Sequence, residues 1–378
     1  MKIKVKLSIL VIGIMAVIIM GVAIAGFSVL LLRRASIISM EMNSRLIHHL
    51  ADKQIEYLRG RKDGYLKILH TLAQIMKEYE DIPAEMRRDI FDSLLYSAIA
   101  YEQAMITMYT VWKPNAIDAM DASFMARPGS CPETGQFASA FSRETGEVIH
   151  RLSGDLENAM EFLNGPNSRN DRVEHLVPGM VAGDDAYLLS LMVPIVSPRT
   201  NEVVGGVGGT LAIGMMQAIV ERAIDYYEEI AVKAIYAGDG RILASYRPDR
   251  IGRSLIDADT IYGDCIYDAY QAVLDGRESE FKSYYDTLGA NVIMVMAPFT
   301  IGNSGATWTV MVGAKEEHLM EEIQSMTKLT IILAVLSMFV SGVIIFSILV
   351  FITRPMIIVT ERLKKVSAAK GILPDKFS

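Results

Sequence analysis

The chain has 378 residues, more than one typical domain of about 100–200 residues, and 51% of them are hydrophobic. A formal net charge of −7, without a basic stripe interleaved with aromatic residues, argues against a nucleic-acid partner. The two cysteines, Cys131 and Cys265, are too few for a disulfide framework. They could form one bridge in an oxidising compartment, but two unpaired, partly buried thiols are the favoured interpretation.

The first apolar run extends from Leu7 to Leu32 and follows Lys2, Lys4 and Lys6. Ala23-Ile24-Ala25 resembles a signal-peptidase site, so a cleaved signal peptide is one interpretation. The apolar core of a signal peptide usually has only ~7–15 residues, however, and this run continues to Leu32. The favoured interpretation is a cytoplasmic N-terminus over residues 1–6 and an uncleaved transmembrane helix over 7–32.

A long helix is predicted over residues 35–80. Its apolar stripe begins with residues that recur every four positions, namely Ile38, Met42, Leu46 and Leu50. A helix that keeps one apolar face after a membrane span suits a dimer seam or the spine of a domain. Pro83 then starts another helix, which is expected to turn Met86, Ile90, Leu94 and Ala98 inward.

A distal lobe is predicted over about 83–230. Ala104–Trp112 is rich in β-branched and aromatic residues and predicts a strand. Asp121–Gly183 has little periodicity, and a loop-rich insertion of this length is more often a binding lid than filler. Two strands follow at Tyr187–Val196 and Glu202–Ile213, and then a helix over Gly214–Glu229.

A proximal lobe is predicted over about 231–314. It begins with a hairpin, 232–236 and 241–246, that turns at Gly238-Asp239-Gly240. A helix around 264–274 and strands at 278–285, 291–299 and 306–314 complete it, and an exit helix covers 315–328. The expected fold class is therefore α+β, with two lobes in tandem, each an antiparallel sheet flanked by helices.

The second apolar run, Leu329 to Ile352, contains no Asp, Glu, Lys, Arg or His. At a rise of ~1.5 Å per residue it is long enough to cross a hydrocarbon core of ~30 Å. The flanking charges place both termini inside the cell, although Arg33 and Arg34 argue the other way. The predicted location is thus the inner (plasma) membrane, with two spans and residues 33–328 outside the cytoplasm.

The chain resembles the double Cache sensor domains of methyl-accepting chemotaxis proteins and related membrane receptors. In the distal lobe the similar motifs are 111–118 (VWKPNAID) with Asp121, 134–137 (TGQF), 187–195 (YLLSLMVPI) and the glycine-rich strand 205–210 (GGVGGT). In the proximal lobe they are 238–245 (GDGRILAS) and 251–255 (IGRSL). Thr353-Arg354-Pro355 and the amphipathic 356–366 are similar to the start of a HAMP linker, here 353–378. The resemblance implies PAS-like Cache lobes behind a long N-terminal helix, between two transmembrane helices.

Two departures from the family limit what the resemblance implies. Amino-acid-sensing members use an Arg-x-Trp-Tyr group and an aspartate in the glycine-rich strand. This sequence has no Arg-x-Trp-Tyr, and Thr210 stands where the aspartate is expected. A cationic amine would then lose a charge-assisted hydrogen bond of ~1.5–3 kcal/mol, so an ordinary α-amino acid is a poor first candidate. The HAMP resemblance ends at Ser378, before a second HAMP helix or a signalling coil.

No catalytic constellation is found: the sequence has no His-Glu-x-x-His, Walker loop or Gly-x-Ser-x-Gly, and its histidines are scattered. We therefore expect neither an enzyme nor a metal or cofactor. The predicted ligand-binding residues lie on or beside the distal strands and the long loop, and they are Tyr109, Trp112, Asp118, Asp121, Arg143, Tyr187, Ser190 and Thr210. The structural alternative is that Tyr109 and Trp112 are core residues of the sheet and that Asp118 and Asp121 cap turns.

The favoured function is a chemoreceptor-like sensor, a homodimer by resemblance, that binds a small solute in the distal lobe. The signal would pass through the second span and the HAMP linker to cytoplasmic signalling proteins. The output module could be a chemotaxis coil, a histidine kinase or a cyclic-dinucleotide enzyme. A protein-binding scaffold is the alternative from another class, and it would show an exposed apolar patch instead of a cavity. A membrane-tethered enzyme is disfavoured because no nucleophile–base pair can be named.

Overall fold

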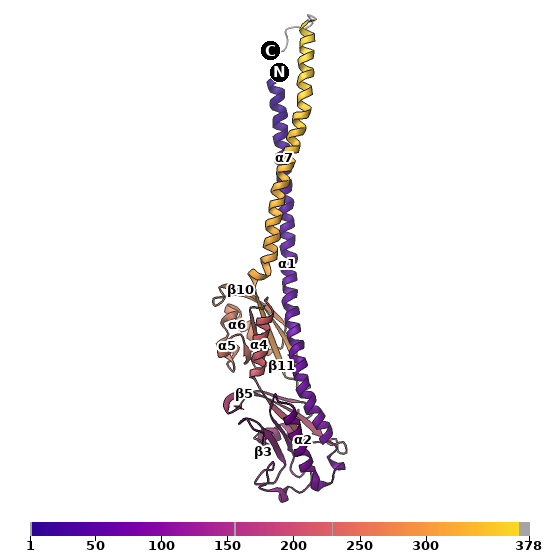
Figure 1. Cartoon of the computed structure of the whole chain (residues 1–378), viewed down its shortest axis with the longest axis vertical. Coiled ribbons are helices and arrows are strands. Elements are labelled where there is room, and N and C mark those ends of the chain that lie inside the picture. The colour runs from indigo at the N-terminus through magenta and orange to yellow at the C-terminus, as the bar shows by residue number, and fades with distance from the viewer. Residues whose placement is uncertain (1, 155, 229, 370–378) are drawn as a thin grey trace. The chain divides into compact units, whose positions relative to one another are not determined.

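The computed structural model describes residues 2–154, 156–228 and 230–369, and in parts of the two long helices it describes only the backbone. The chain divides into two compact units (Figure 1). One unit is Arg45–His318, and the other combines Met1–Ser44 with Leu319–Ser378. Each unit has its own internal packing, so each is described by itself.

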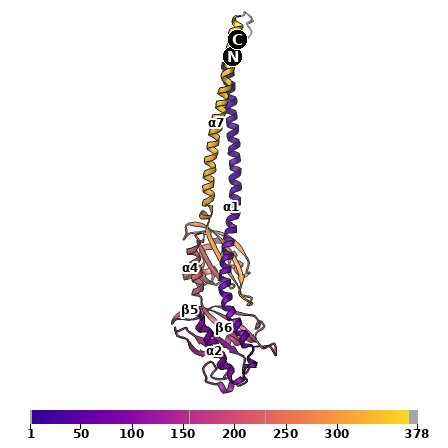
Figure 2. The same ribbon diagram turned by 45° about the vertical axis from the view of Figure 1, so that its right-hand side comes forward.

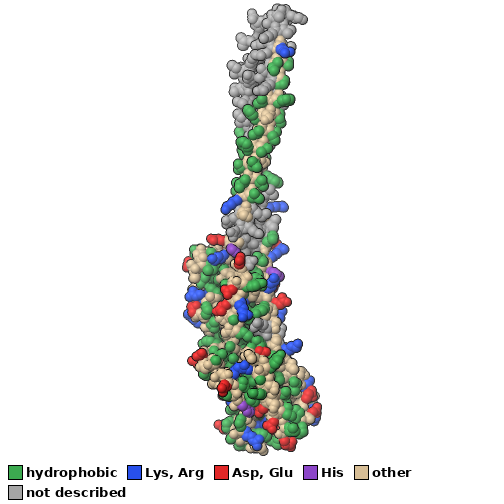
Figure 3. All heavy atoms as spheres, viewed as in Figure 1, with side chains coloured by type: hydrophobic (Ala, Val, Ile, Leu, Met, Phe, Trp, Pro, Cys, Tyr) green, Lys and Arg blue, Asp and Glu red, His purple; other side chains and the backbone are tan. Residues whose placement is uncertain are grey.

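The unit formed by the chain ends is helical. It contains the first part of α1 (Lys2–Met76) and most of α7 (Glu316–Ala369). Within α7, Lys328–Ile348 is long and apolar enough to cross a membrane, with a mean hydropathy of 2.7. Figure 3 shows hydrophobic side chains along this helix. It is the only such segment among the described residues.

Two predictions about the chain ends fall largely outside the description. The expected first span, residues 7–32, is helical as part of α1, but many of its side chains are not described. The side chains of Lys2, Lys4 and Lys6 are not described either. In the expected HAMP linker the helix α7 continues through Pro355, and residues 370–378 lie outside the described part. These features remain predictions.

The distal lobe is built on a six-stranded antiparallel sheet with the order β3-β2-β1-β6-β5-β4. The strands are β1 (Met105–Trp112), β2 (Ala138–Ser142), β3 (Ile149–Leu152), β4 (Arg172–Val181), β5 (Asp184–Val196) and β6 (Val203–Ala212). Helix α2 (Arg87–Tyr101) packs on one face, and α3 (Leu156–Asn164) packs on the other. The strands predicted at 104–112, 187–196 and 202–213 are confirmed.

Two predictions about the distal lobe were wrong. The segment Asp121–Gly183 is not a loop-rich lid, because it contains β2, β3, α3 and β4. Strands β2 and β3 are short, and β2 (ASAFS) consists largely of small residues, which hides the alternation. Helix α2 buries Arg88, Phe91, Leu95 and Ile99 instead of the face predicted from Met86 and Ile90. The buried arginine explains this error, since apolar periodicity places a charged residue on the outer face.

The proximal lobe has a five-stranded antiparallel sheet with the order β8-β7-β11-β10-β9. Its strands are β7 (Val232–Ala237), β8 (Ile242–Ser245), β9 (Ser279–Tyr285), β10 (Ala290–Thr300) and β11 (Thr307–Lys315). Helices α5 (Leu255–Ala258) and α6 (Ile266–Leu274) cover one face, and α4 (Gly214–Tyr226) packs on β7 and β8. Figure 2 shows α4 and α1 beside this sheet. The predicted α+β class with two antiparallel sheets is confirmed, and both cysteines are unpaired.

A buried carboxylate organises the face of the proximal sheet that packs on α5 and α6. Asp259 accepts hydrogen bonds from the Tyr236 hydroxyl (2.7 Å) and from Arg250 Nη1 (2.6 Å). The Tyr236 and Tyr262 hydroxyls lie 3.0 Å apart, and both rings are fully buried. The charges and hydroxyls of this network satisfy one another, so this face of the sheet is filled by the protein's own side chains.

Lys233 is a buried cation on the other face of the same sheet. Its side chain is 0% exposed, and its Nζ donates to Gln54 Oε1 (2.7 Å) and to the Ile219 carbonyl (3.4 Å). Both acceptors are neutral. Burial therefore lowers the pKa of Lys233 to about 7.

Lys233 makes the stability of the unit Arg45–His318 depend on pH. Because the unfolded chain holds this proton up to a pKa near 10.4, raising the pH from 7 to 10 increases the free energy of unfolding by ~1.4 kcal/mol per pH unit. We expect Lys233→Met to remove this slope and to stabilise the protein most below pH 7. Denaturant unfolding at several pH values measures it, with the exposed Lys67→Met as the matched control. An unchanged slope in Lys233→Met would show that another group causes the dependence.

Candidate functional site

The pleat of β1 separates two predicted site residues onto opposite faces of the distal sheet. Trp112 faces α2, where its ring stacks on Phe91 with centroids 5.6 Å apart and meets the edge of Tyr79 at 5.0 Å. Tyr109 faces α3 and packs with Val111 and Met192. Trp112 is therefore a core residue, and the candidate site has to be built on the α3 face.

Four hydroxyl residues form a continuous row on the α3 face, here called the hydroxyl row. The antiparallel register pairs Ser142 with Thr107, Thr107 with Thr210, and Thr210 with Ser190, on β2, β1, β6 and β5. Ser190 is in turn paired with Glu174 on β4. Directly opposed residues of an antiparallel pair point to the same face, so these short polar side chains line one strip of the sheet.

Tyr109 forms a wall beside the hydroxyl row. Its hydroxyl lies 3.3 Å from Ser190 Oγ, two strands away, so the ring reaches across β6. This path depends on Gly208, because a Cβ added there would lie 2.4 Å from Tyr109 Cζ. The glycine thus creates the space that the tyrosine ring occupies.

Charged side chains stand at both ends of the row. At the β2 end, Glu144 accepts hydrogen bonds from Arg151 Nη2 (2.8 Å) and from Thr107 Oγ1 (3.4 Å). At the β4 end, Arg172 pairs with Glu174. Each carboxylate is thus engaged by an arginine.

Two polar atoms near the row are buried without a hydrogen-bond partner among the described residues: Thr210 Oγ1 and Arg151 Nε. An unsatisfied buried polar atom costs ~1–3 kcal/mol, and such atoms are uncommon unless a ligand or water meets them. One N–H donor, on Arg151, and one hydroxyl, on Thr210, can therefore still form a hydrogen bond. A solute with hydrogen-bond acceptors would satisfy both.

The structure brings three of the eight predicted residues together: Tyr109, Ser190 and Thr210. Asp118 and Asp121 instead form a buried cage with Arg88, whose Nε lies 2.6 Å from Asp118 Oδ2 and whose Nη2 lies 2.6 Å from Asp121 Oδ1. Asp118 also accepts the Met120 amide, and Asp121 the Asn115 amide, so the turn-capping alternative describes them better.

Arg143 and Tyr187 also lie away from the row. Arg143 Nη2 donates to the Ile99 carbonyl at the end of α2. Tyr187 is 47% exposed and lies against Gly252 of the proximal lobe.

Sequence reasoning missed Thr107, Ser142, Glu144 and Arg151. Alternation along β1 could have shown Thr107, which is two residues before Tyr109, but the other three lie beyond β1.

A Ser–His–Asp group on the α2 face does not have the geometry of a catalytic triad. Ser139 Oγ lies 2.8 Å from His150 Nε2 and also bonds Asp92. Asp92 Oδ2 is 3.6 Å from the same Nε2 atom, whereas a triad places its carboxylate on Nδ1. Ser139 is also fully buried, and burial raises the pKa of Asp92. This group joins α2 to β2 and β3.

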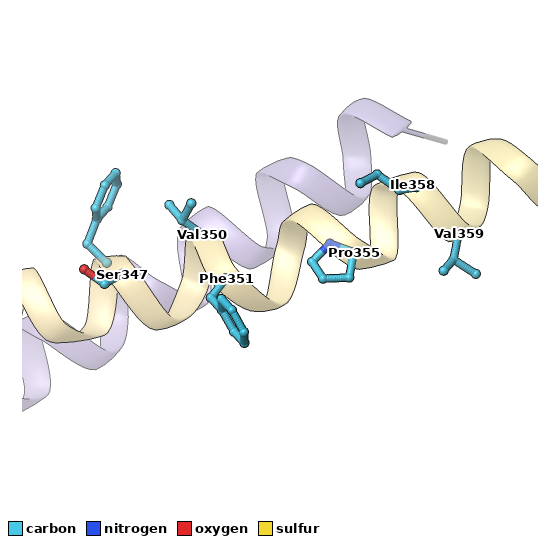
Figure 4. Close-up of a pocket in the computed structure, with 7 residues that line it drawn as sticks. Ser347, Val350, Phe351, Pro355, Ile358 and Val359 are labelled. Carbon is cyan, nitrogen blue, oxygen red and sulfur yellow. The ribbon is translucent and has the colours of Figure 1, made fainter.

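A groove of about 680 Å³ lies on α7 in the unit formed by the chain ends (Figure 4). It is lined by Phe346, Ser347, Val350, Phe351, Pro355, Ile358 and Val359. Ser347 is the polar member of this lining, and its hydroxyl donates to the Val343 carbonyl (2.8 Å). Such a surface suits lipid chains better than a polar solute.

No protein-family model matches the sequence, and no curated protein matches it. Solved structures do. The extracellular domain of mmHK1S-Z2, which is named as a histidine kinase, aligns with a TM-score of 0.59 at 18% identity, covering 73% of this chain and 98% of that domain. The periplasmic sensory domain of the Campylobacter jejuni chemoreceptor Tlp1 aligns with a TM-score of 0.54 at 14% identity, covering 73% and 96%. A structure named methyl-accepting chemotaxis protein X aligns with a TM-score of 0.53 at 15% identity, covering 73% and 100%.

The fold is that of a double Cache sensor domain. By their names these neighbours are an extracellular domain of a histidine kinase, a periplasmic sensory domain of a chemoreceptor and a methyl-accepting chemotaxis protein, in agreement with the resemblance found in the sequence. At these identities the likeness establishes the fold, and the ligand has to be argued from the residues of this chain.

The Arg88 cage is a structural element, and its loss should affect stability. We expect Asp118→Asn to lower the free energy of unfolding by ~3 kcal/mol, because it leaves a buried guanidinium with one carboxylate fewer. The matched control is Asp249→Asn, which breaks an exposed pair with Arg247 and should leave the free energy of unfolding nearly unchanged. Chemical denaturation measures both variants. Equal, small effects would contradict the structural role.

In the ligand-free protein, replacing Thr210 by valine should increase stability. Thr210→Val keeps the side-chain shape and removes the unsatisfied hydroxyl, so we expect the free energy of unfolding to rise by ~1 kcal/mol. Ser190→Ala, by contrast, removes the partner of the Tyr109 hydroxyl and should lower it. Thermal and denaturant unfolding of the ligand-free protein test this. A destabilised Thr210→Val would mean that the hydroxyl is already satisfied.

Proposed function

We propose that this chain is the sensor part of a transmembrane receptor and that its distal lobe binds a small polar solute on the hydroxyl row. The observation that carries the proposal is a pair of buried atoms without a hydrogen-bond partner among the described residues: Thr210 Oγ1 in the hydroxyl row and Arg151 Nε on β3 beside it. Buried polar atoms are normally satisfied, so a site that leaves two of them without a partner in the protein suits a bound solute.

Each residue of the site has a distinct task in this proposal. Arg151 Nε donates to an acceptor of the solute, and Ser190 and Thr210 supply hydroxyls that both donate and accept. The Tyr109 ring gives the solute an apolar wall. Because the carboxylates of Glu144 and Glu174 are already engaged by arginines, the site favours acceptor-rich solutes over primary amines. This agrees with threonine at position 210 in place of an aspartate.

A contact path leads from the hydroxyl row to the start of α7. Strand β4, which carries Glu174, contacts the proximal lobe through His175 Nε2 and Asp239 Oδ2 (3.2 Å), and Asp171 accepts the Asn303 amide (3.0 Å). In the proximal lobe, Glu316 at the first residue of α7 bonds Lys282 on β9 and Asn291 on β10. A solute shifts the equilibrium along this path by its different affinity for the two states of the distal lobe.

The membrane arrangement completes the proposal. The chain crosses the inner membrane at 7–32 and at 329–352, and the second span overlaps the apolar segment Lys328–Ile348 of α7. The sensor unit lies outside the cytoplasm and forms a homodimer. Residues 353–378 begin a HAMP linker, which passes the signal to a chemotaxis coil, a histidine kinase or a cyclic-dinucleotide enzyme.

A thermal-shift screen of the full chain in detergent micelles tests the solute site. Acceptor-rich small solutes such as hydroxy acids, monocarboxylates and polyols are the first library. A solute that binds the row should raise Tm in the wild type, and the shift should fall strongly in Arg151→Met and Thr210→Val, since each loses a hydrogen bond worth about tenfold in affinity.

Thr309→Val is the matched control for this screen. Thr309 Oγ1 is also buried without a partner among the described residues, but it lies on β11 in the proximal lobe. It should keep the full response to the solute. Equal shifts in all the variants, or no shift from any class of solute, would contradict the site.

A further inference from the structure

A groove of about 500 Å³ lies between α1 and α4 beside the proximal sheet, away from the hydroxyl row. From α1 it is lined by Lys53, Gln54 and Tyr57, and from α4 by Ile219, Arg222 and Tyr226. Its volume is that of a small-molecule pocket. Its residues belong to the sensor unit but have no part in the proposed function.

The buried amine of Lys233 lies directly behind this groove. Both of its hydrogen-bond acceptors, Gln54 Oε1 and the Ile219 carbonyl, belong to residues that line the groove. Neither acceptor carries a charge. A protonated Lys233 is therefore a buried cation that lacks an anionic partner in the described contacts, and such a charge is costly unless an anion compensates it.

The charged side chains that line the groove are two cations and one anion. Lys53 of α1 lines the groove on one side, and Arg222 and Asp225 of α4 line it on the other. Glu221 of α4 accepts a hydrogen bond at Oε1 from Gln217 Nε2 (3.0 Å). The neighbouring strands present Val312 and the backbone of Tyr246, whose amide donates to the Lys233 carbonyl. Burial is the cause of the lowered pKa of Lys233, without a carboxylate opposing it.

The walls of the groove are aromatic. Tyr57, Tyr226 and Tyr227 line it, and the rings of Tyr226 and Tyr227 meet edge to face with centroids 5.0 Å apart. The Tyr226 side chain is 80% exposed. Exposed tyrosines next to cationic side chains suit a flat, apolar body that ends in an anionic group.

We infer that this groove binds a small aromatic carboxylate, whose anionic group lies near Lys53 and Arg222 and compensates the buried amine of Lys233, while its ring packs on the tyrosines. The site is independent of the hydroxyl row, because it lies in the other lobe and shares no residue with it. Binding is coupled to a proton. Above pH 7 the amine of Lys233 is mostly neutral, and a bound anion favours its charged form, so the protein takes up a proton as the ligand binds.

Isothermal titration of the full chain in detergent micelles tests the inference. Benzoate is the probe, benzamide is its neutral isostere, and acetate is an anion without a ring. At about pH 8, titration in two buffers of different ionisation heat gives the proton uptake. We expect benzoate to bind in the millimolar range or tighter with an uptake approaching one proton, and both analogues to bind at least about tenfold more weakly.

Variants assign the binding to the groove. Arg222→Met should weaken benzoate binding about tenfold, and Lys233→Met should abolish the proton uptake. Thr210→Val, in the hydroxyl row, should bind benzoate as the wild type does, so failure of the solute site and failure of this site are separable.

Four results would overturn the inference. They are the absence of benzoate binding, equal binding of benzamide, unchanged affinity in Arg222→Met, and full proton uptake in Lys233→Met.

Discussion

The candidate solute site depends on one constraint, the antiparallel register of the distal sheet. The hydroxyl row exists because β2, β1, β6 and β5 are aligned so that each contributes a serine or threonine at the same height. The β1–β6 pairing shifts between Met105 and Thr107. Such an irregularity reverses which residues face which side, and it directs Thr107 and Tyr109 toward α3. A one-residue slip would turn the whole strip toward α2.

The glycines of β6 are the second requirement of this site. On the α3 face, Gly206 and Gly208 make room for Met192 and Tyr109, since an added Cβ would lie 2.9 Å from Met192 Sδ and 2.4 Å from Tyr109 Cζ. A glycine-rich strand loses more backbone entropy on folding than other strands. Here β6 is central and is paired on both sides by β1 and β5. The ladder hydrogen bonds on both edges offset that cost.

The sequence predicts the framework well and the site partly, and the difference has a physical cause. Strands rich in apolar and β-branched residues, such as β1 and β5, can be predicted from the sequence, and they contain Tyr109 and Ser190. Residue pairs that depend on partners far away in the chain do not. Asp118 and Asp121 looked like ligand groups because their partner, Arg88, lies on a helix with an otherwise apolar inner face. Trp112 was misassigned because position 112 is three residues from Tyr109, an odd spacing that changes the face of the sheet.

The two lobes use their sheets in opposite ways, and one helix touches both. In the proximal lobe the face toward α6 is filled by the network around Asp259, so the concave space lies on its other side, between α1 and α4. Helix α1 contacts Asp171, the residue before β4 of the distal sheet, through His70 (3.2 Å), and it contacts Lys233 on β7 of the proximal sheet through Gln54 (2.7 Å). These positions are ~24 Å apart along a continuous helix. A solute that moves β4 and an anion that favours the protonated form of Lys233 therefore act on the same helix. If the solute changes the affinity for the anion by some factor, the anion must change the affinity for the solute by the same factor.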